Sequence, residues 1–201
     1  KAQIKEKSSF VHSYLKAATE WKTWNARLWL LSVLILFSGF ISTLMYFFIP
    51  IDAYLSGANL PMVVLMAILG AIPSLFGYKL GKMADHRNKY LLISYGLAGI
   101  ALIACGLAIF PFYWFKLVAI FLMGLILELF YVVQSSLITT LGPAETYGER
   151  GSAFEGIISI GELIAPLILG IGLDALGFSA VSYVIMGSAL ILSFGYSFIK
   201  K

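Results

Sequence analysis

The sequence predicts an all-α membrane protein with six transmembrane helices. Three observations support this prediction: 60% of the 201 residues are hydrophobic, only 12% are charged, and the mean hydropathy is +0.92. Soluble domains carry roughly 25% charged residues. The apolar residues also gather in long runs separated by short polar segments, as bilayer-spanning helices require.

Each apolar run is close to the length of about 20 residues that crosses the hydrocarbon core of a bilayer. The runs cover approximately residues 28–49, 59–81, 90–110, 113–137, 152–173 and 180–199. We expect Pro50 and Pro111 to end the first and third spans, because proline cannot donate a helical hydrogen bond. Pro73 and Pro166 lie inside the second and fifth spans, where we expect kinks.

The Lys and Arg residues predict the orientation of the six spans. Thirteen of the fourteen fall on the side that holds both termini, and only Lys116 falls on the other side. Since positive residues concentrate in cytoplasmic segments, we expect both termini in the cytoplasm. We expect Lys116 to extend its amine to the outer interface. The net charge of +4 is then a signal of topology and requires no nucleic-acid partner.

Residues 1–27 precede the bundle of residues 28–201 and have a pattern of their own. Their hydrophobic residues recur at helical spacing: Phe10, Tyr14, Leu15, Ala18 and Trp21. This spacing, together with the basic residues that flank it, predicts an amphipathic helix on the cytoplasmic membrane surface. A solvated linker is the alternative. The chain begins with Lys1 rather than Met, which is expected of a fragment or a processed product.

The connection between the second and third spans has the most specific local pattern. Gly77 and Gly81 stand four residues apart, a spacing that lets another helix approach closely. Asp85 is a lone acid among basic residues, where its carboxylate can face the positive N-terminus of a neighbouring helix. Arg87 and Lys89 can pair with acids on adjoining elements or with lipid phosphates.

The pattern Gly81-x-x-x-Asp85-x-x-Asn88-Lys89 resembles the loop signature of the major facilitator superfamily, usually Gly-x-x-x-Asp-x-x-Gly-Arg/Lys. Asn88 replaces the usual Gly, and we expect it to adopt the positive φ of a tight turn. In the family this loop latches two six-helix halves together on the cytoplasmic side. The resemblance therefore implies a conformational latch at Asp85, Arg87 and Lys89, whereas the alternative is a generic basic loop.

The start of the fifth span supports the same resemblance. Arg150-Gly151 opens this span, and Gly161 and Pro166 follow at the family's spacing. Ala165 stands where the family commonly has Gly, so the motif does not indicate antiport.

Together the two motifs imply one half of a major-facilitator-type bundle, the carboxy-terminal half of a twelve-helix transporter. Gly77, Gly81, Arg150 and Glu155 then belong to the latch. The partner is a second six-helix half, either upstream in the same polypeptide or in a second copy.

Two acidic residues lie deep in the predicted spans, Glu128 in the fourth and Glu162 in the fifth. An ionised group at that depth costs about 2.5–3.5 kcal/mol on insertion scales, so it should face protein or a water-filled cavity. Tyr131 shares a helical face with Glu128, and Gln134 lies beside that face. In the resembled family this helix lines the central cavity. Glu128 is therefore a candidate for proton coupling or for binding a substrate cation, with Tyr131 and Gln134 as contacts.

Glu162 is a candidate for the same path, or for a hydrogen-bonded packing residue at the bend of Pro166. No Lys or Arg lies deep in any span, which favours cationic, neutral or hydrophobic solutes over anions. The sequence thus predicts a secondary transporter that moves a small solute by alternating access, with protons as the expected energy source. Symport, antiport and uniport remain open, and a membrane scaffold with a transporter-like fold is the alternative.

An enzyme is not expected from this sequence. His12 and His86 both lie outside the predicted spans, and no pair of aspartates occurs within them. Cys105 is the only cysteine, so neither a disulfide within the chain nor a cysteine-based metal site can form. No cofactor or metal is therefore expected.

Overall fold

The computed structural model describes residues 26–140 and 147–199. Within these residues every element of secondary structure is a helix, and six helical spans are long and apolar enough to cross a membrane. The prediction of an all-α bundle with six apolar spans is therefore confirmed. The predicted amphipathic helix falls on residues before 26, which lie outside the described part of the chain.

The first two spans are each built from more than one helical segment. The first contains α2 (Ala26–Thr43), a π-helical turn (Leu44–Phe48) and α3 (Ile49–Leu55). The second contains α4 (Leu60–Ala71), a 3₁₀ turn (Ile72–Phe76) and α5 (Gly77–His86). The other four are single helices: α6 (Lys89–Ile109), α7 (Tyr113–Thr140), α8 (Tyr147–Leu176) and α9 (Phe178–Ser197).

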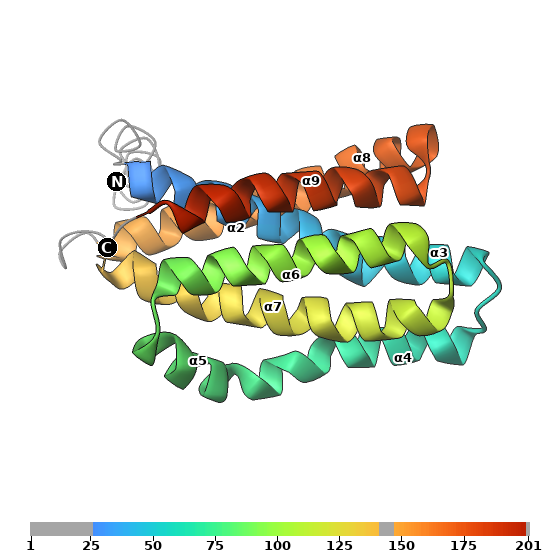
Figure 1. Ribbon diagram of the computed structural model, residues 1–201, viewed down its shortest axis with the longest axis horizontal. Coiled ribbons are helices and arrows are strands. Elements are labelled where there is room, and N and C mark those ends of the chain that lie inside the picture. Colours follow the sequence, from blue (N-terminus) through green and yellow to red (C-terminus); the bar gives the residue numbers. More distant parts are fainter. Residues whose placement is uncertain (1–25, 141–146, 200–201) are drawn as a thin grey trace, which may run out of the picture.

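Helix α7 lies at the centre of the packing. It contacts α2, α4, α5, α6 and α8, while α6 also packs along α9 and α2 packs along α8 (Figure 1). Figure 1 shows α4 and α5 on one side of α7, and α2, α8 and α9 on the other. The helices run roughly parallel to one another, so that each span of 20–29 residues reaches from one end of the bundle to the other.

Close helix contacts depend on small side chains, as expected where lipid removes the hydrophobic driving force between helices. A Cβ built on Gly39 of α2 would lie 3.3 Å from the carbonyl carbon of Gly161 in α8. Between α6 and α9, the hydroxyls of Ser94 and Ser193 each donate to the other residue's carbonyl, at 2.9 and 2.8 Å. These contacts join helices that are far apart in the sequence.

The prediction that Pro50 ends the first span is wrong. Pro50 lies in the first turn of α3, and the span continues to Leu55. The π turn explains the continuation: the N–H of Ile49 bonds to the carbonyl of Leu44, five residues back. An α-helix would press the ring of Pro50 against the carbonyl of Tyr46, and the wider π turn relieves that clash.

The other two internal prolines behave differently from each other. At Pro73, where we expected a kink, the second span changes from α-helical to 3₁₀ geometry. Proline lacks the N–H that would bond four residues back, which favours such a change. Pro166 lies inside the unbroken helix α8.

Asn88 does not adopt the expected positive φ. Its φ is −67°, and it forms the N-cap of α6, where its side-chain oxygen accepts a hydrogen bond of 3.0 Å from the N–H of Tyr90. Asparagine is among the best N-cap residues, because its side chain satisfies an N–H that the helix leaves free. Arg87 is extended and supplies the turn between α5 and α6.

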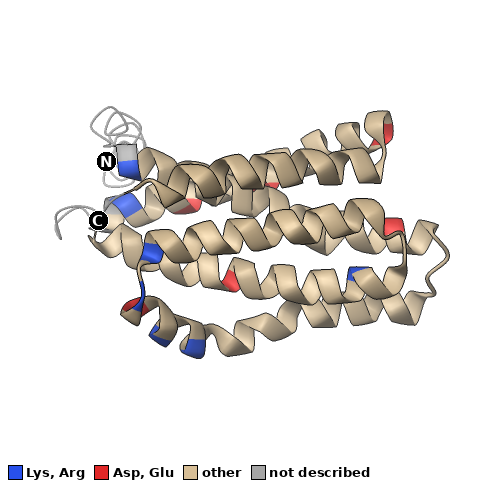
Figure 2. Ribbon diagram, viewed as in Figure 1, with Lys and Arg blue, Asp and Glu red and all other residues tan. Residues whose placement is uncertain are grey.

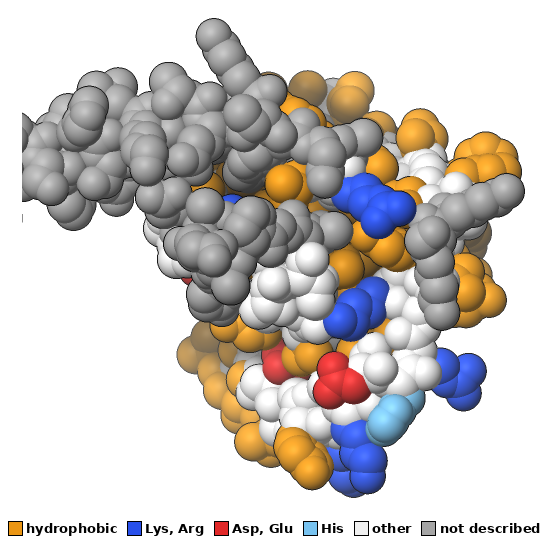
Figure 3. All heavy atoms as spheres, turned by 90° about the vertical axis from the view of Figure 1, so that its left-hand side faces the viewer, with side chains coloured by type: hydrophobic (Ala, Val, Ile, Leu, Met, Phe, Trp, Pro, Cys, Tyr) orange, Lys and Arg blue, Asp and Glu red, His pale blue; other side chains and the backbone are white. Residues whose placement is uncertain are grey.

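Lys and Arg side chains divide unequally between the two ends of the bundle. Every Lys and Arg in the described residues except Lys116 lies at the end where α2 begins and α9 ends (Figure 2). Figure 3 views that end and shows Lys and Arg side chains across its surface. The clustering predicted from the sequence is therefore present within the described chain.

Lys116 does not extend into the outer interface as expected. Its side chain is buried, and its Nζ lies 2.5 Å from Oδ2 of Asp52 and 5.6 Å from the centroid of the Phe178 ring. Asp52 reaches it because the first span continues past Pro50 as helix α3. A buried lysine requires such a partner, since an isolated charge there is strongly disfavoured.

Candidate functional site

A polar cavity lies between α2, α4, α7 and α8, and its volume is about 360 Å³. All four residues predicted for the transport path line it: Glu128, Tyr131, Gln134 and Glu162. The segments that form the cavity each lie near the middle of a span. The structure therefore brings these predicted residues together at the depth where a bilayer would be most apolar.

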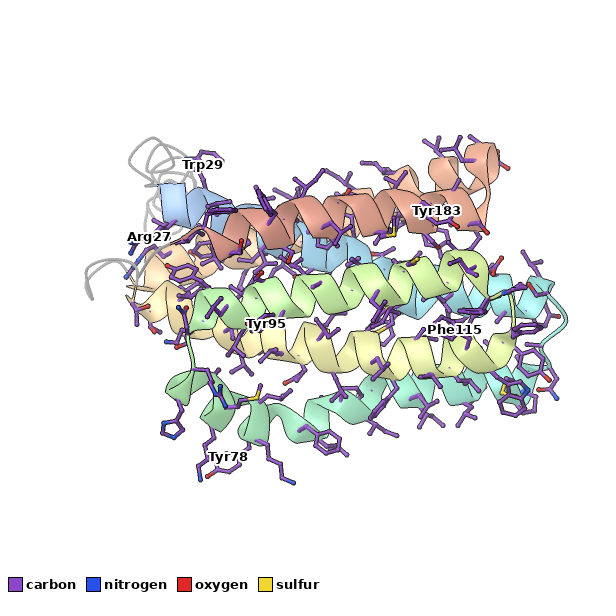
Figure 4. All side chains as sticks on the ribbon, in the orientation of Figure 1. Arg27, Trp29, Tyr78, Tyr95, Phe115 and Tyr183 are labelled. Atoms are coloured by element: carbon purple, nitrogen blue, oxygen red, sulfur yellow. The ribbon has the colours of Figure 1, made fainter. Side chains whose placement is uncertain are left out.

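Glu128 comes from the middle of α7 and faces the point in the second span where the 3₁₀ turn meets α5. A Cβ built on Gly77 would lie 2.8 Å from the Oε1 atom of Glu128, closer than ordinary packing allows. Only glycine at position 77 therefore leaves room for this position of the carboxylate. The side chain of the adjacent Tyr78 points away from the bundle (Figure 4). The sequence assigned Gly77 to the latch, whereas its contact in the structure is with the candidate site.

Tyr46 enters the cavity from the π turn of the first span. Its hydroxyl donates to the carbonyl of Gly70 at 3.1 Å, just before the 3₁₀ turn of the second span. The two irregular turns thus meet at the wall of the cavity. The hydrogen bond fixes the Tyr46 ring between the first and second spans.

The α2 wall carries small polar side chains, Ser38 and Ser42. Gln134 of α7 is buried, and its Nε2 donates to Oγ of Ser38 at 3.2 Å. The close crossing of α2 and α8 at Gly39 and Gly161 brings the next residue of α8, Glu162, to the same cavity. Glu162 itself is exposed in the described chain.

Among the residues that the structure describes, the lining contains two carboxylates and two tyrosines but no Lys or Arg. Glu128 is half-buried, whereas Tyr46 and Tyr131 are 46% and 58% exposed. This arrangement offers negative charge, aromatic faces and hydroxyl groups to whatever enters. It can bind or release a proton at a carboxylate, and it can hold a positively charged group.

The predicted latch residues are only partly brought together. Lys89 at the start of α6 donates from Nζ to Oγ of Ser136 near the end of α7, at 2.5 Å. Asp85 and Arg87 are exposed, and among residues 26–140 and 147–199 Asp85 has no hydrogen bond or ion pair. Its predicted contact with a helix N-terminus is therefore not made within this chain's described residues.

The remaining latch residues lie on two helices: Gly81 on α5, and Arg150 and Glu155 on α8. Gly81 packs against α7, where a Cβ would lie 3.7 Å from Cγ1 of Val132, an ordinary contact. Arg150 is buried near the start of α8, and Glu155 is exposed one turn later. These residues share the end of the bundle where α2 begins and α9 ends.

A larger groove of about 510 Å³ lies between α2, α8 and α9. Its walls are apolar except for Ser188, whose hydroxyl bonds to the carbonyl of Val184 in its own helix. A groove without a free polar group offers nothing to orient a polar solute. The smaller polar cavity is therefore the candidate site.

Reasoning from the sequence missed Tyr46, Ser38 and Ser42. The two serines are i and i+4 on α2, and Ser42 and Tyr46 are again four apart. This spacing forms a polar stripe on an otherwise apolar span, and it was the available signal. The role of Gly77 required the structure, because no sequence pattern links it to Glu128.

The chain was compared with known proteins. No family model matches it, and no curated protein matches it.

Proposed function

We propose that this chain forms half of a secondary transporter of the major facilitator type, which moves a small solute by alternating access. The observation that supports the proposal most strongly is the polar cavity halfway along the spans, with Glu128 and Glu162 in its lining. Secondary transporters bind their substrates near the bilayer midplane, between two repeats of helices. Deep ionisable residues in a membrane protein commonly mark such a path.

The interruptions of the first two spans support the same proposal. A π turn and a 3₁₀ turn lie directly beside the cavity and contribute Tyr46 and Ser74 to its lining. Irregular helical backbone within a membrane is tolerated where protein or a water-filled cavity satisfies its polar groups. Such interruptions often accompany binding sites.

We further propose that Glu128 couples transport to protons. Its carboxylate is the most enclosed acid of the cavity, and Gly77 leaves the space that it occupies. A carboxyl group that faces an apolar surrounding can exchange its proton when the cavity opens to water on either side. Glu162 lies at the exposed edge of the same cavity and serves as the second acidic contact.

In this proposal a second six-helix half covers the open side of the cavity, and both termini lie in the cytoplasm. The exposed carboxylates of Glu155 and Glu162 support the first part, because ionisable groups in a span should not face lipid. The clustering of Lys and Arg at the end where α2 begins and α9 ends supports the second. Asp85 and Arg87 are exposed at that end and are available for a latch to the other half.

Accessibility of the cavity to a thiol reagent tests alternating access without knowledge of the substrate. Ser42 lines the cavity, so we expect Ser42→Cys, in a Cys105→Ala background, to react with a membrane-impermeant maleimide from both sides of the membrane. An imposed pH gradient should change the ratio of labelling from the two sides. Glu128→Gln should remove that dependence on the gradient.

A scaffold that does not transport predicts a different result. Labelling of Ser42→Cys would then occur from one side only, and no pH gradient would change it. Either that outcome or an unchanged response in the Glu128→Gln variant would contradict the proposal. Asp174→Asn is the matched control, since Asp174 is an acid of α8 outside the cavity.

A further inference from the structure

We infer that the polar cavity binds an organic cation, specifically a substituted ammonium group carried on a compact apolar body. This inference rests on the proposed function, because it names the class of solute for the same site. It draws on three features of the lining: the sign of its charges, the position of its aromatic rings and its size.

The charges of the lining select a cation. Glu128 and Glu162 reach the cavity from two different helices, α7 and α8, and none of the described residues that line it is a Lys or Arg that could balance them. An anionic solute would meet two carboxylates without a positive partner, at a depth where unpaired charge is costly. A cationic solute would instead neutralise an acid as it enters.

The aromatic rings favour an ammonium group over a small metal ion. Tyr46 and Tyr131 both line the cavity, and the bond from the Tyr46 hydroxyl to Gly70 holds that ring in place. Aromatic faces attract substituted ammonium groups, whose hydration is weaker than that of a small metal ion. Rings held in advance lose little freedom when the ligand binds.

The donor set also fits poorly to an inorganic divalent ion. Calcium takes six to eight oxygen ligands, several of them from carboxylates. In the described residues no group of three or more His, Cys, Asp and Glu side chains gathers to hold a metal. The cavity volume of about 360 Å³ is instead of the size that small organic ligands occupy.

The polar groups beside the acids would orient such a ligand. Gln134 is buried and is fixed by its bond to Ser38, so it presents a positioned amide to the cavity. Ser42 adds a hydroxyl group on the α2 wall, whereas the Ser74 hydroxyl bonds to the carbonyl of Ala71 in its own span. A few placed polar groups within a mostly apolar wall are the usual means by which a pocket fixes the orientation of a ligand.

Binding of radiolabelled phenyltrimethylammonium to the purified protein in lipid nanodiscs tests the inference. This probe carries a permanent charge, so its binding does not depend on its own protonation. We expect saturable binding that unlabelled probe displaces and that benzenesulfonate, an anion of similar size, does not. Glu128→Gln and Glu162→Gln should each weaken binding by about tenfold or more, while Asp174→Asn leaves it unchanged.

Equal displacement by benzenesulfonate, or affinities of both glutamine variants within about twofold of the parent protein, would overturn the inference. Glu162 is exposed, so its substitution keeps the test available even where Glu128→Gln impairs folding. The maleimide experiment separates the two proposals. Cation binding together with one-sided labelling contradicts the transport proposal but not the inferred class of solute. Gradient-dependent labelling without cation binding contradicts the inferred class of solute but not the transport proposal.

Discussion

Gly77 and Gly81 occupy the same face of α5, one turn apart, yet their surroundings differ. A Cβ at Gly77 would meet Oε1 of Glu128 at 2.8 Å, whereas a Cβ at Gly81 would meet Val132 at 3.7 Å. The first distance forces the carboxylate to move, and the second is ordinary van der Waals contact. Gly77 therefore contacts the candidate site, whereas Gly81 contributes to the packing of α5 against α7.

We predict that Gly77→Ala weakens phenyltrimethylammonium binding by about tenfold, or about 1.4 kcal/mol. The added methyl group displaces the Glu128 carboxylate, which is the far end of a flexible side chain, so the fold should persist. Gly81→Ala is the matched control and should leave binding unchanged. Alanine also stabilises a helix by roughly 0.5–1 kcal/mol relative to glycine, so neither variant should unfold at a lower temperature. Equal effects of the two substitutions on binding would contradict this assignment.

At the residue scale the sequence identified the acids of the site but not their surroundings. Glu128 and Glu162 were found because charged residues inside apolar runs are conspicuous, and helical spacing added Tyr131 and Gln134. Tyr46 was missed because a tyrosine in an apolar span has many ordinary positions. Its contact with Gly70 depends on the packing of two spans, which local spacing does not determine.

Lys116 of α7 contacts both α3 and α9, at the end of the bundle opposite the start of α2. Lys116 of α7 pairs with Asp52 of α3 and lies over the ring of Phe178 at the start of α9. The lysine side chain is 2% exposed and that of Asp52 is 31% exposed. Removal of either partner leaves a charge behind, but the charge left on Lys116 is the more deeply buried.

We predict that Asp52→Asn lowers stability by about 3–5 kcal/mol, because it leaves Lys116 buried without a carboxylate. Lys116→Met should cost less, since water can still solvate part of Asp52. The double variant should recover most of the loss, because it removes both charges together. Thermal unfolding in one detergent measures all three, and a double variant less stable than Asp52→Asn would rule out the pairing as the cause.

At the element scale the six spans could be predicted from the sequence, since apolar runs of this length are typical of helices that cross a bilayer. The ends of the spans were less accurate. We expected the first span to end at Pro50, but it continues through the π turn into α3. This continuation places Asp52 beside Lys116. A π turn has no recognisable sequence pattern. Here it lies directly before α3, whose first turn contains Pro50, as a single turn between two α-helical segments.

At the scale of the whole molecule, three spans leave most of their surface open. The second span and α8 are, with α9, the least buried of the six. The second span and α8 flank the cavity, and α8 exposes Glu155 and Glu162 on one face. Lipid cannot satisfy these carboxylates. Some other protein surface or a water-filled space should therefore cover this face, whereas the exposed Leu102 of α6 can face lipid directly.

Spin labels can distinguish these environments in nanodiscs. Ser159 lies between Glu155 and Glu162 on α8, and Ser159→Cys and Leu102→Cys can each be labelled in the Cys105→Ala background. We predict that oxygen, which concentrates in lipid, reaches the label at position 102 much more readily than the label at 159. We expect the label at position 159 to show either restricted motion or frequent collision with a water-soluble nickel complex. Equal oxygen accessibility at both positions would mean that α8 faces lipid, and the proposed second half would then be wrong.

The same label also distinguishes the two sources of the second half. Each copy of the chain carries one label at position 159, so magnetic coupling between labels arises only where two copies pack face to face. Since α8 borders the cavity, a second copy across it would bring the two labels within the range of such measurements. Coupling together with low oxygen accessibility therefore indicates a symmetric pair of identical halves around one shared cavity. Low oxygen accessibility without coupling indicates a different six-helix half, which in the resembled family belongs to the same polypeptide.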